Sequence, residues 1–274
     1  MSGEITQVPD VRRYGEWCLI AGASEGIGAA FAEALAGSGY KLVMVARRPE
    51  PLEAAAARLR EKHGVEVRTI STDLADPDAA ERVFAQCADI NVGLLIYNAG
   101  AVPNMADFHD FPENEAYRTT ILNVIGQTKF SYLFGGRMRE RGRGGIILIG
   151  SIASASGCAR LTTYSAAKAY SQIFAEGLWY ELKPYGIDVL GLSCTTTRTP
   201  AMEQLGMPLD NPDYPSVEPE QVVAEGFAAF GREPIHFMNG SRATVEALQA
   251  MPRAEVVQMI SEGIKAVVPT KAPS

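Results

Sequence analysis

The sequence predicts a doubly wound α/β fold, in which about seven parallel strands form one sheet with helices on both faces. Three observations lead to this prediction. Short apolar segments alternate with longer segments of helical periodicity from residue 17 to residue 192. The short segments are apolar throughout, as strands buried on both faces should be. A glycine-rich turn connects the first of these strands to the first helix.

The first half of the chain supplies four strands and three helices. The first helix has apolar residues at helical spacing and stops before Gly39, and the alanine-rich second helix stops before Gly64, as helices often do at glycine. Pro77 opens the third helix, where its missing N–H is tolerated. The expected strands are residues 17–21, 41–46, 65–70 and 93–97, and the expected helices are residues 26–38, 49–63 and 77–87.

The second half continues the alternation and then departs from it. Helices are expected at residues 113–139, 162–185 and 220–230, strands at 145–149, 187–192 and 234–238, and one or two C-terminal helices at 241–267. Residues 195–219 contain five prolines and little periodicity, so we interpret them as a substrate lid with at most a short helix. We expect one domain over 1–274, with its cofactor and catalytic core at about 15–193.

Composition excludes several functional classes. The formal charge is −7 and no dense Lys/Arg block occurs, so neither nucleic acid nor an anionic membrane is an expected partner. The four cysteines form no close pair, which argues against a zinc site and a disulfide framework. Residues 1–14 lack an apolar run, and no segment is apolar enough to span a membrane, so we expect neither a signal peptide nor a membrane anchor, and a cytoplasmic location.

The glycine-rich turn predicts a phosphate-binding site. Gly22, Gly26 and Gly28 follow the first strand with Ser24, Glu25 and Ile27 between them, in the spacing G-x-x-x-G-x-G. Glycines let the backbone approach a ligand closely, and the following helix presents free N–H groups and a partial positive charge to a pyrophosphate. The alternative is that these glycines serve packing alone. Their place after the first strand of a doubly wound sheet favours a dinucleotide.

The motifs together resemble a known family. The glycine turn, the Asn98-Ala99-Gly100 sequence, Ser151, and Tyr164-x-x-x-Lys168 occur in the order and spacing of the short-chain dehydrogenase/reductase family, over roughly residues 15–200. The resemblance implies a Rossmann-type fold and an oxidoreductase that moves a hydride between a nicotinamide cofactor and a carbonyl/alcohol pair. It also implies a homodimer or homotetramer formed through the helices at 113–139 and 162–185.

Residues after the second strand indicate which cofactor is preferred. A carboxylate there would bind the ribose 2′-hydroxyl and repel a 2′-phosphate, but this chain has Ala46 followed by Arg47 and Arg48. The guanidinium group suits phosphate, which favours NADP(H), although NAD(H) stays possible and both arginines are alternatively solvated surface residues. The resemblance implies Arg47 as the main phosphate contact with Ser24 assisting, whereas Glu25 stands where many NADP-preferring relatives have a basic residue.

Further cofactor contacts follow from the resemblance alone. It implies that Asp73 and Leu74 contact the adenine, although Asp73 is alternatively a turn cap. It also implies that Asn98 stabilises the sheet and lines the cofactor floor, with Ala99 and Gly100 as further cofactor contacts. Tyr97 stands where relatives usually have a first asparagine. Thr197 and Thr199 are further expected contacts, but Cys194-Thr195 replaces the usual Pro-Gly, and we expect that turn to survive with altered geometry.

A proton-transfer group is predicted from four residues. Tyr164 and Lys168 are four positions apart and so share one face of a helix. The phenol serves as general acid or base if the ammonium and a nicotinamide cation lower its pKa. Ser151, at a strand end thirteen residues before Tyr164, is placed to donate to the substrate oxygen, with Ser154 and Ser156 as competitors. The resemblance implies that Asn123 holds a water that relays protons to the lysine; the alternative is a helix surface residue.

The sequence identifies the substrate less closely than the cofactor. The expected lid carries apolar side chains that suit a hydrophobic or aromatic carbonyl compound, or that simply pack the lid on the domain: Met202, Leu205, Met207, Pro208, Leu209 and Tyr214. A non-catalytic nucleotide sensor or scaffold on the same fold is the alternative function. A sugar-nucleotide epimerase would need more chain than the roughly 75 residues that follow Thr199.

Overall fold

A seven-stranded, wholly parallel sheet forms the centre of the molecule. The computed structural model describes residues 7–100, 105–110, 112–212 and 215–267, so Tyr214 of the expected lid lies outside the described residues. The strand order is β3-β2-β1-β4-β5-β6-β7, and every neighbouring pair runs parallel. The strands are β1 Trp17–Ala21, β2 Lys41–Ala46, β3 Val67–Ser71, β4 Val92–Tyr97, β5 Gly144–Ser151, β6 Ile187–Cys194 and β7 Ile235–Phe237. The predicted doubly wound fold is confirmed.

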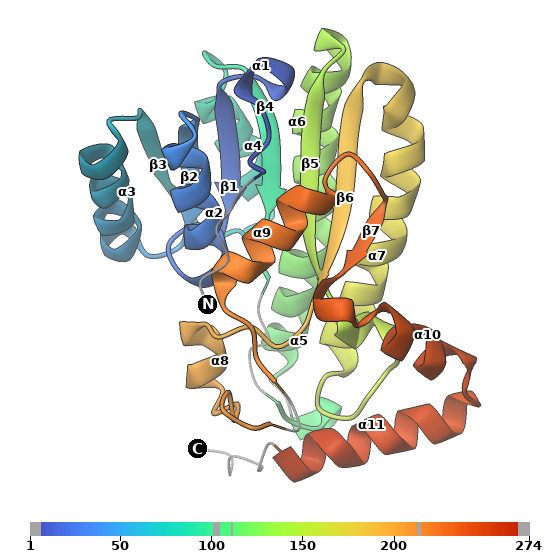
Figure 1. The fold of residues 1–274 in the computed structure, drawn as a ribbon. Coiled ribbons are helices and arrows are strands. Elements are labelled where there is room, and N and C mark those ends of the chain that lie inside the picture. Colours follow the sequence, from blue (N-terminus) through green and yellow to red (C-terminus); the bar gives the residue numbers. More distant parts are fainter. Residues whose placement is uncertain (1–6, 101–104, 111, 213–214, 268–274) are drawn as a thin grey trace.

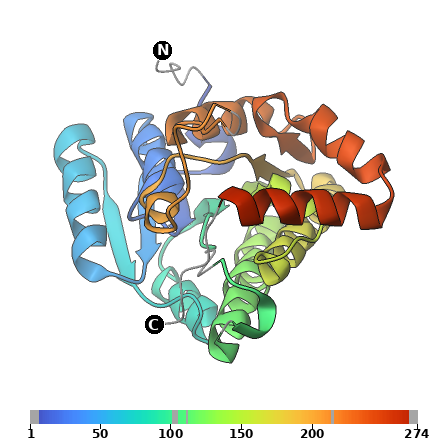
Figure 2. The same ribbon diagram turned by 90° about the horizontal axis from the view of Figure 1, so that it is seen from below.

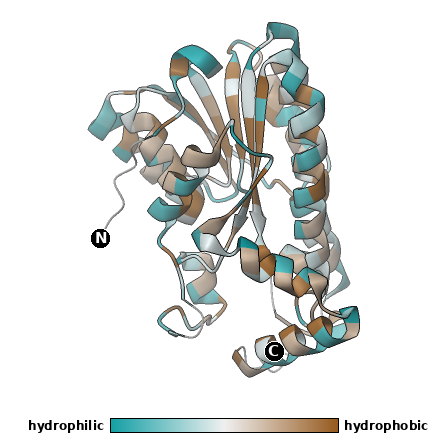
Figure 3. Ribbon diagram, turned by 45° about the vertical axis from the view of Figure 1, so that its right-hand side comes forward, coloured by the Kyte–Doolittle hydropathy of each residue, from teal (hydrophilic) through white to brown (hydrophobic). Residues whose placement is uncertain are grey.

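Helices cover both faces of this sheet, each over its own hydrophobic core (Figure 1). Successive strand residues contribute to opposite cores, for example Ile20 to one and Leu19 to the other, because side chains alternate along a strand. Figure 3 shows the strands mostly brown, while the helices carry hydrophilic stretches. One face packs against α2 Gly26–Gly37, α3 Pro49–His63 and α9 Pro219–Ala229, and the other against α4 Ala79–Gln86, α6 Gln127–Arg141 and α7 Thr162–Leu182.

Four further helices gather beyond the carboxyl ends of the strands, below the sheet in Figure 1 and towards the viewer in Figure 2. They are α5 Glu113–Thr120, α8 Pro200–Gln204, α10 Arg242–Ala250 and α11 Arg253–Val267. Ligands of open α/β sheets bind at this edge. None of the described helices is both long and apolar enough to cross a bilayer.

The long helix expected over residues 113–139 is interrupted. Between α5 and α6 the chain forms a π-helical turn, Ile121–Gly126, so the single-helix prediction is wrong. A side chain from the sheet enters this turn and accounts for the interruption, as described below. The sequence also gave no sign of α1 Val11–Tyr14, which the Asp10 side chain caps by accepting from the Arg12 amide.

Strand β6 extends further than expected. It continues to Cys194, which pairs with Ser151 at the end of β5, instead of stopping at Leu192. A proline cannot donate to a sheet ladder, so Cys194-Thr195 in place of Pro-Gly lets the strand run on. The following loop is tied at its base. The backbone of Thr197 bridges to Val217, and the Arg198 guanidinium donates to the Leu209 carbonyl at 3.1 Å and pairs with Asp210 at 2.6 Å.

Candidate active site

The glycine turn lies between the carboxyl ends of β1 and β4. Gly22 (φ +83°) and Gly26 (φ +57°) adopt backbone angles that favour glycine. Gly28 has no such angle, but a Cβ there would lie 1.9 Å from the Gly22 carbonyl oxygen. The Asn98 Nδ2 donates to that same oxygen at 2.7 Å and holds the turn against the neighbouring strand. Asn98 is therefore a structural part of the turn.

The rest of the turn leaves the start of α2 accessible. Glu25, the residue before α2, makes no side-chain capping bond, and Ser24, Glu25 and Ile27 are all half-buried. The free N–H groups of the first helical turn therefore face the edge of the sheet, where a phosphate would be stabilised. The residues present fit a pyrophosphate.

The two arginines after β2 have different partners. Arg48 pairs with Glu25 at 2.6 Å, with both side chains exposed. The exposed Arg47 guanidinium forms no ion pair with any residue that the structure describes, and its charge lowers the pKa of Asp73. The unusual acid at position 25 therefore neutralises one arginine and leaves the other available for an anion.

Asp73 is occupied by a partner that the sequence did not indicate. Burial raises its pKa, but hydrogen bonds from the Ala75 amide and from Arg118 outweigh this and lower it. Arg118 Nη2 lies 2.8 and 2.7 Å from the two carboxylate oxygens, and the Ala75 amide is 3.0 Å from one of them. The turn-cap alternative for Asp73 therefore holds, while the adjoining Leu74 is buried. No local pattern links α5 to β3, so Arg118 could not have been found from spacing.

Ser151, Tyr164 and Lys168 converge at the end of β5. The Ser151 hydroxyl lies close enough to the Tyr164 phenol to lower its pKa, and Lys168 Nζ lies 5.5 Å from the centre of the Tyr164 ring. The ammonium donates to the Ile149 carbonyl at 2.9 Å. The competing serines are directed elsewhere: Ser154 donates to Gln172 and Ser156 to the Gly157 carbonyl. The spacing argument for Ser151 therefore agrees with the geometry.

Burial governs the protonation of this group. It raises the pKa of Tyr164 to about 12, against a lowering by the nearby Ser151 hydroxyl, and it lowers the pKa of Lys168 to about 8. In the free protein the phenol is therefore protonated at neutral pH. The thiol of Cys194, whose pKa burial raises to about 12, is protonated as well.

Asn123 belongs to the same cluster. It is buried, so the alternative of a helix surface residue is wrong. Its Nδ2 donates to the Thr119 carbonyl at 3.0 Å, while its Oδ1 has no hydrogen-bond partner among the described residues. A Cβ on Gly100 would lie 2.4 Å from that oxygen and 3.2 Å from Lys168 Nζ, so both atoms flank Gly100. Ala99 lies close to the glycine turn, because a Cβ on Gly22 would lie 3.0 Å from the Ala99 amide nitrogen.

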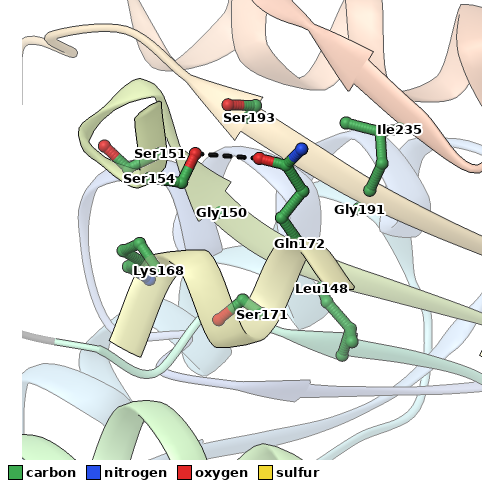
Figure 4. A pocket seen from close by; sticks show the side chains of 10 residues that line it. All are labelled: Leu148, Gly150, Ser151, Ser154, Lys168, Ser171, Gln172, Gly191, Ser193 and Ile235. Carbon is green, nitrogen blue, oxygen red and sulfur yellow. Dashed lines mark hydrogen bonds between the residues drawn. The ribbon is translucent and has the colours of Figure 1, made fainter. Parts of the chain in front are cut away.

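A small cavity of about 10 Å³ lies behind the serine, between β5, β6 and α7 (Figure 4). Ser151, Lys168 and Ser171 line it together with Ser193, whose hydroxyl is buried and has no partner among the described residues. It is too small for a carbonyl substrate.

Thr197 and Thr199, at the base of the lid, make different contacts. Thr199 packs over the glycine turn, because a Cβ on Gly26 would lie 3.0 Å from its Cγ2, and its hydroxyl caps α8 by accepting from Met202. The buried Thr197 donates to the Thr195 carbonyl at 3.1 Å. The structure thus brings Thr199 to the expected cofactor edge, with its hydroxyl already engaged.

Comparisons with known proteins agree with this arrangement. The family model described as short chain dehydrogenase matches residues 16–209. The 7beta-hydroxysteroid dehydrogenase of Clostridium sardiniense is 30% identical over 260 residues, which cover 91% of this chain and 96% of that protein.

Two solved structures are similar over nearly their whole length. One, from a study of 7beta-hydroxysteroid dehydrogenase stereoselectivity, has a TM-score of 0.83 at 30% identity and covers 92% of this chain and 99% of its own. The other, a short-chain dehydrogenase from Sphingobium yanoikuyae in complex with NADPH, has a TM-score of 0.76 at 29% identity, with coverages of 94% and 98%. The resemblance noted in the sequence is confirmed, and the chain belongs to the short-chain dehydrogenase family of oxidoreductases.

Proposed function

We propose that this chain is an NADP(H)-dependent oxidoreductase that interconverts a bulky, largely apolar ketone, such as an oxosteroid, and its secondary alcohol. The observation that supports it most is the contact of Tyr164 with Ser151 beside Lys168, at the sheet edge that carries the glycine turn. The steroid class follows from the names of its relatives. The non-catalytic alternative has no comparable observation in its favour.

The chemistry assigned to the chain is proton transfer and charge stabilisation. When bound, the nicotinamide supplies the hydride to the carbonyl carbon, or accepts it in the reverse direction. The Ser151 hydroxyl donates to the substrate oxygen, and the Tyr164 phenol gives that oxygen its proton as charge develops there. Lys168 and Asn123 complete the path by which the phenol regains a proton from solvent. The cofactor would be held by Gly22, Ser24, Gly26, Gly28, Asn98 and Thr199.

The substrate is proposed to lie under residues 195–219, with the C-terminal helices as a second wall. Helix α11 contacts the loop between Ser151 and Tyr164. Arg253 donates to the Ala155 carbonyl at 3.2 Å, and the Ser261 hydroxyl accepts from the Ala159 amide at 3.0 Å. Leu209 is buried and Met202, Leu205, Met207 and Pro208 are half-buried, so these side chains offer apolar surface on the inner side of the lid.

Turnover on a ketone panel tests the proposal. NADPH oxidation is measured with oxosteroids, an aromatic ketone and a small aliphatic ketone at matched concentrations. We expect kcat/KM to be at least about tenfold higher for the polycyclic ketones than for the small one, because they bury more apolar area under the lid. Tight NADPH binding without turnover on any ketone would contradict the proposal and favour a sensor.

The cofactor preference is proposed to depend on Arg47. Arg47→Ala is expected to raise the Kd of NADPH about 10- to 100-fold, because a charge-assisted bond to the 2′-phosphate is lost, and to leave the Kd of NADH unchanged. Fluorescence titration with both cofactors measures this. Arg58→Ala, which removes an exposed charge from the following helix α3, is the control. Equal losses of NADPH and NADH affinity would argue against a 2′-phosphate contact.

Self-association through α6 and α7 is also proposed. Tyr132, Ile173 and Tyr180 on these helices are 81%, 65% and 76% exposed, an arrangement of large apolar side chains typical of an interface. Sedimentation is expected to give the mass of two or four chains, and Tyr132→Lys combined with Tyr180→Lys to lower it.

A further inference from the structure

The last residue of β4 reaches out of the sheet into the helix layer. Tyr97 stands where the family usually has an asparagine, and it is only 3% exposed. Its ring packs edge-on against Phe130, with 5.4 Å between ring centres. Its hydroxyl donates to the Leu122 carbonyl at 2.8 Å. A strand residue is thus bonded to the backbone of the π-helical turn Ile121–Gly126.

The turn is shaped to receive this hydroxyl. A Cβ on Gly126 would lie 2.1 Å from the Tyr97 Oη and 3.1 Å from its Cζ, so no larger residue fits beside the phenol. Turns of the π type are rare, are usually single interruptions of α-helices and are frequent at functional sites. Tyr97 and Gly126 together account for the interruption between α5 and α6.

The residue after Leu122 is Asn123. The side-chain amide of Gln127 donates both to the Asn123 backbone carbonyl and to the Ser171 hydroxyl, so the turn is also held from α7. With its backbone oxygen occupied, Asn123 has one available acceptor, the buried Oδ1 that flanks Gly100 together with Lys168 Nζ. The direction of this oxygen depends on the shape of the π-turn.

We propose that Tyr97 is a positioning residue for proton transfer: its hydroxyl holds the π-turn in the shape that directs the Asn123 Oδ1 towards Lys168. The inference rests on the proposed function, in which Asn123 and Lys168 return a proton to Tyr164. Tyr97 itself touches neither substrate nor cofactor in this scheme and acts only through Asn123.

Tyr97→Phe removes the hydroxyl and keeps the ring against Phe130. The Leu122 carbonyl then loses its partner, the turn is no longer held, and the Asn123 amide loses its fixed direction. We expect kcat for ketone reduction to fall about tenfold, while the KM of the ketone and the Kd of NADPH stay within about twofold. Tyr14→Phe is the matched control, because it also removes one hydrogen-bonded tyrosine hydroxyl, bonded to Asp188 at 2.6 Å, but at the opposite edge of the sheet.

A double-mutant cycle separates positioning from general destabilisation. If Tyr97 acts through Asn123, Tyr97→Phe lowers kcat about tenfold in the wild-type background and less than about twofold in an Asn123→Ala background. Losses that multiply across the two substitutions would overturn the inference.

A readout without turnover distinguishes failure of this inference from failure of the proposed function. With ¹³C-lysine labelling, the titration of Lys168 is followed by NMR in the free protein and assigned with Lys168→Arg. In the proposed arrangement the Asn123 oxygen faces the ammonium, so its loss of direction in Tyr97→Phe is expected to lower the midpoint by about half a unit. An unchanged midpoint overturns the inference whether or not any ketone is reduced. A lowered midpoint in a protein without turnover supports the positioning role and counts against the proposed function alone.

Discussion

Replacing Tyr164 by phenylalanine is expected to lower kcat for ketone reduction about a thousandfold, because the phenol is the group proposed to give the substrate oxygen its proton. The phenol lies beside Ser151, and the change leaves the ring and its neighbours in place. The Kd of NADPH is therefore expected to stay within about twofold. Stopped-flow measurement of NADPH oxidation under single-turnover conditions gives the rate of the chemical step.

The pH dependence of the wild type follows from the raised pKa of this phenol. Reduction needs the protonated form, which prevails well below about 12, so its rate should be nearly constant between about pH 6 and pH 8. Oxidation of the alcohol needs the phenolate, so its rate should rise with pH until the phenol titrates in the complex. The rise of the oxidation rate with pH should disappear in the residual activity of Tyr164→Phe.

The control for this variant lies on the same helix. Tyr170→Phe removes a hydroxyl that is 2.7 Å from the Thr128 hydroxyl and is not part of the proposed proton path, so it should retain nearly full activity. Retention of more than about a tenth of the wild-type kcat by Tyr164→Phe would show that the proton comes from another group. The Ser151 hydroxyl would then be the first alternative to examine.

Substituting alanine for Gly28 is expected to remove cofactor binding and to destabilise the fold. The added Cβ would lie 1.9 Å from the Gly22 carbonyl oxygen and 2.8 Å from the Asn98 Nδ2. Backbone cannot yield as a flexible side chain can, so the turn must open, at a cost of about 1–3 kcal/mol. We expect the Kd of NADPH to rise more than about a hundredfold and the Tm to fall by several degrees.

Gly37→Ala at the other end of α2 is the matched control. A Cβ there would meet only the His63 ring, at 3.5 Å, which is ordinary contact. Alanine also favours the helix over glycine by up to about 1 kcal/mol, so this variant should be as stable as the wild type or more stable, with unchanged NADPH affinity. If Gly28→Ala binds NADPH as tightly as Gly37→Ala does, the glycine turn is not the pyrophosphate site.

Much of the fold could be predicted because its signals are local. The apolar segments of β1 and β2 have no polar interruption, and both strands begin and end at the predicted residues. Tyr164 and Lys168 could be paired because a spacing of four residues places them on one helical face. The end of β6 was misplaced because the consequence of losing a proline appears only once the partner strand β5 is known.

The features that escaped prediction join residues far apart in the chain. The π-turn depends on a hydroxyl donated from β4, and Asp73 is held by Arg118 from α5, 45 positions away. Tyr97 was visible as a departure from the family pattern, but its effect on a helix 25 residues later was not. Periodicity describes one element at a time, so it cannot indicate which side chain of one layer enters another.

The burial of Lys168 has a consequence for the stability of the whole domain. Its pKa is about 8 in the folded protein against an ordinary 10.5, so between these values the unfolded chain binds more protons than the folded one. Unfolding free energy therefore increases as the pH rises from about 8 to about 10.5, and this contribution is lost as the pH falls through 8. At neutral pH the folded domain carries a desolvated positive charge that opposes its own folding. A ligand that offers hydroxyl acceptors to that ammonium would relieve the penalty, so part of its affinity would come from stabilising the domain that receives it.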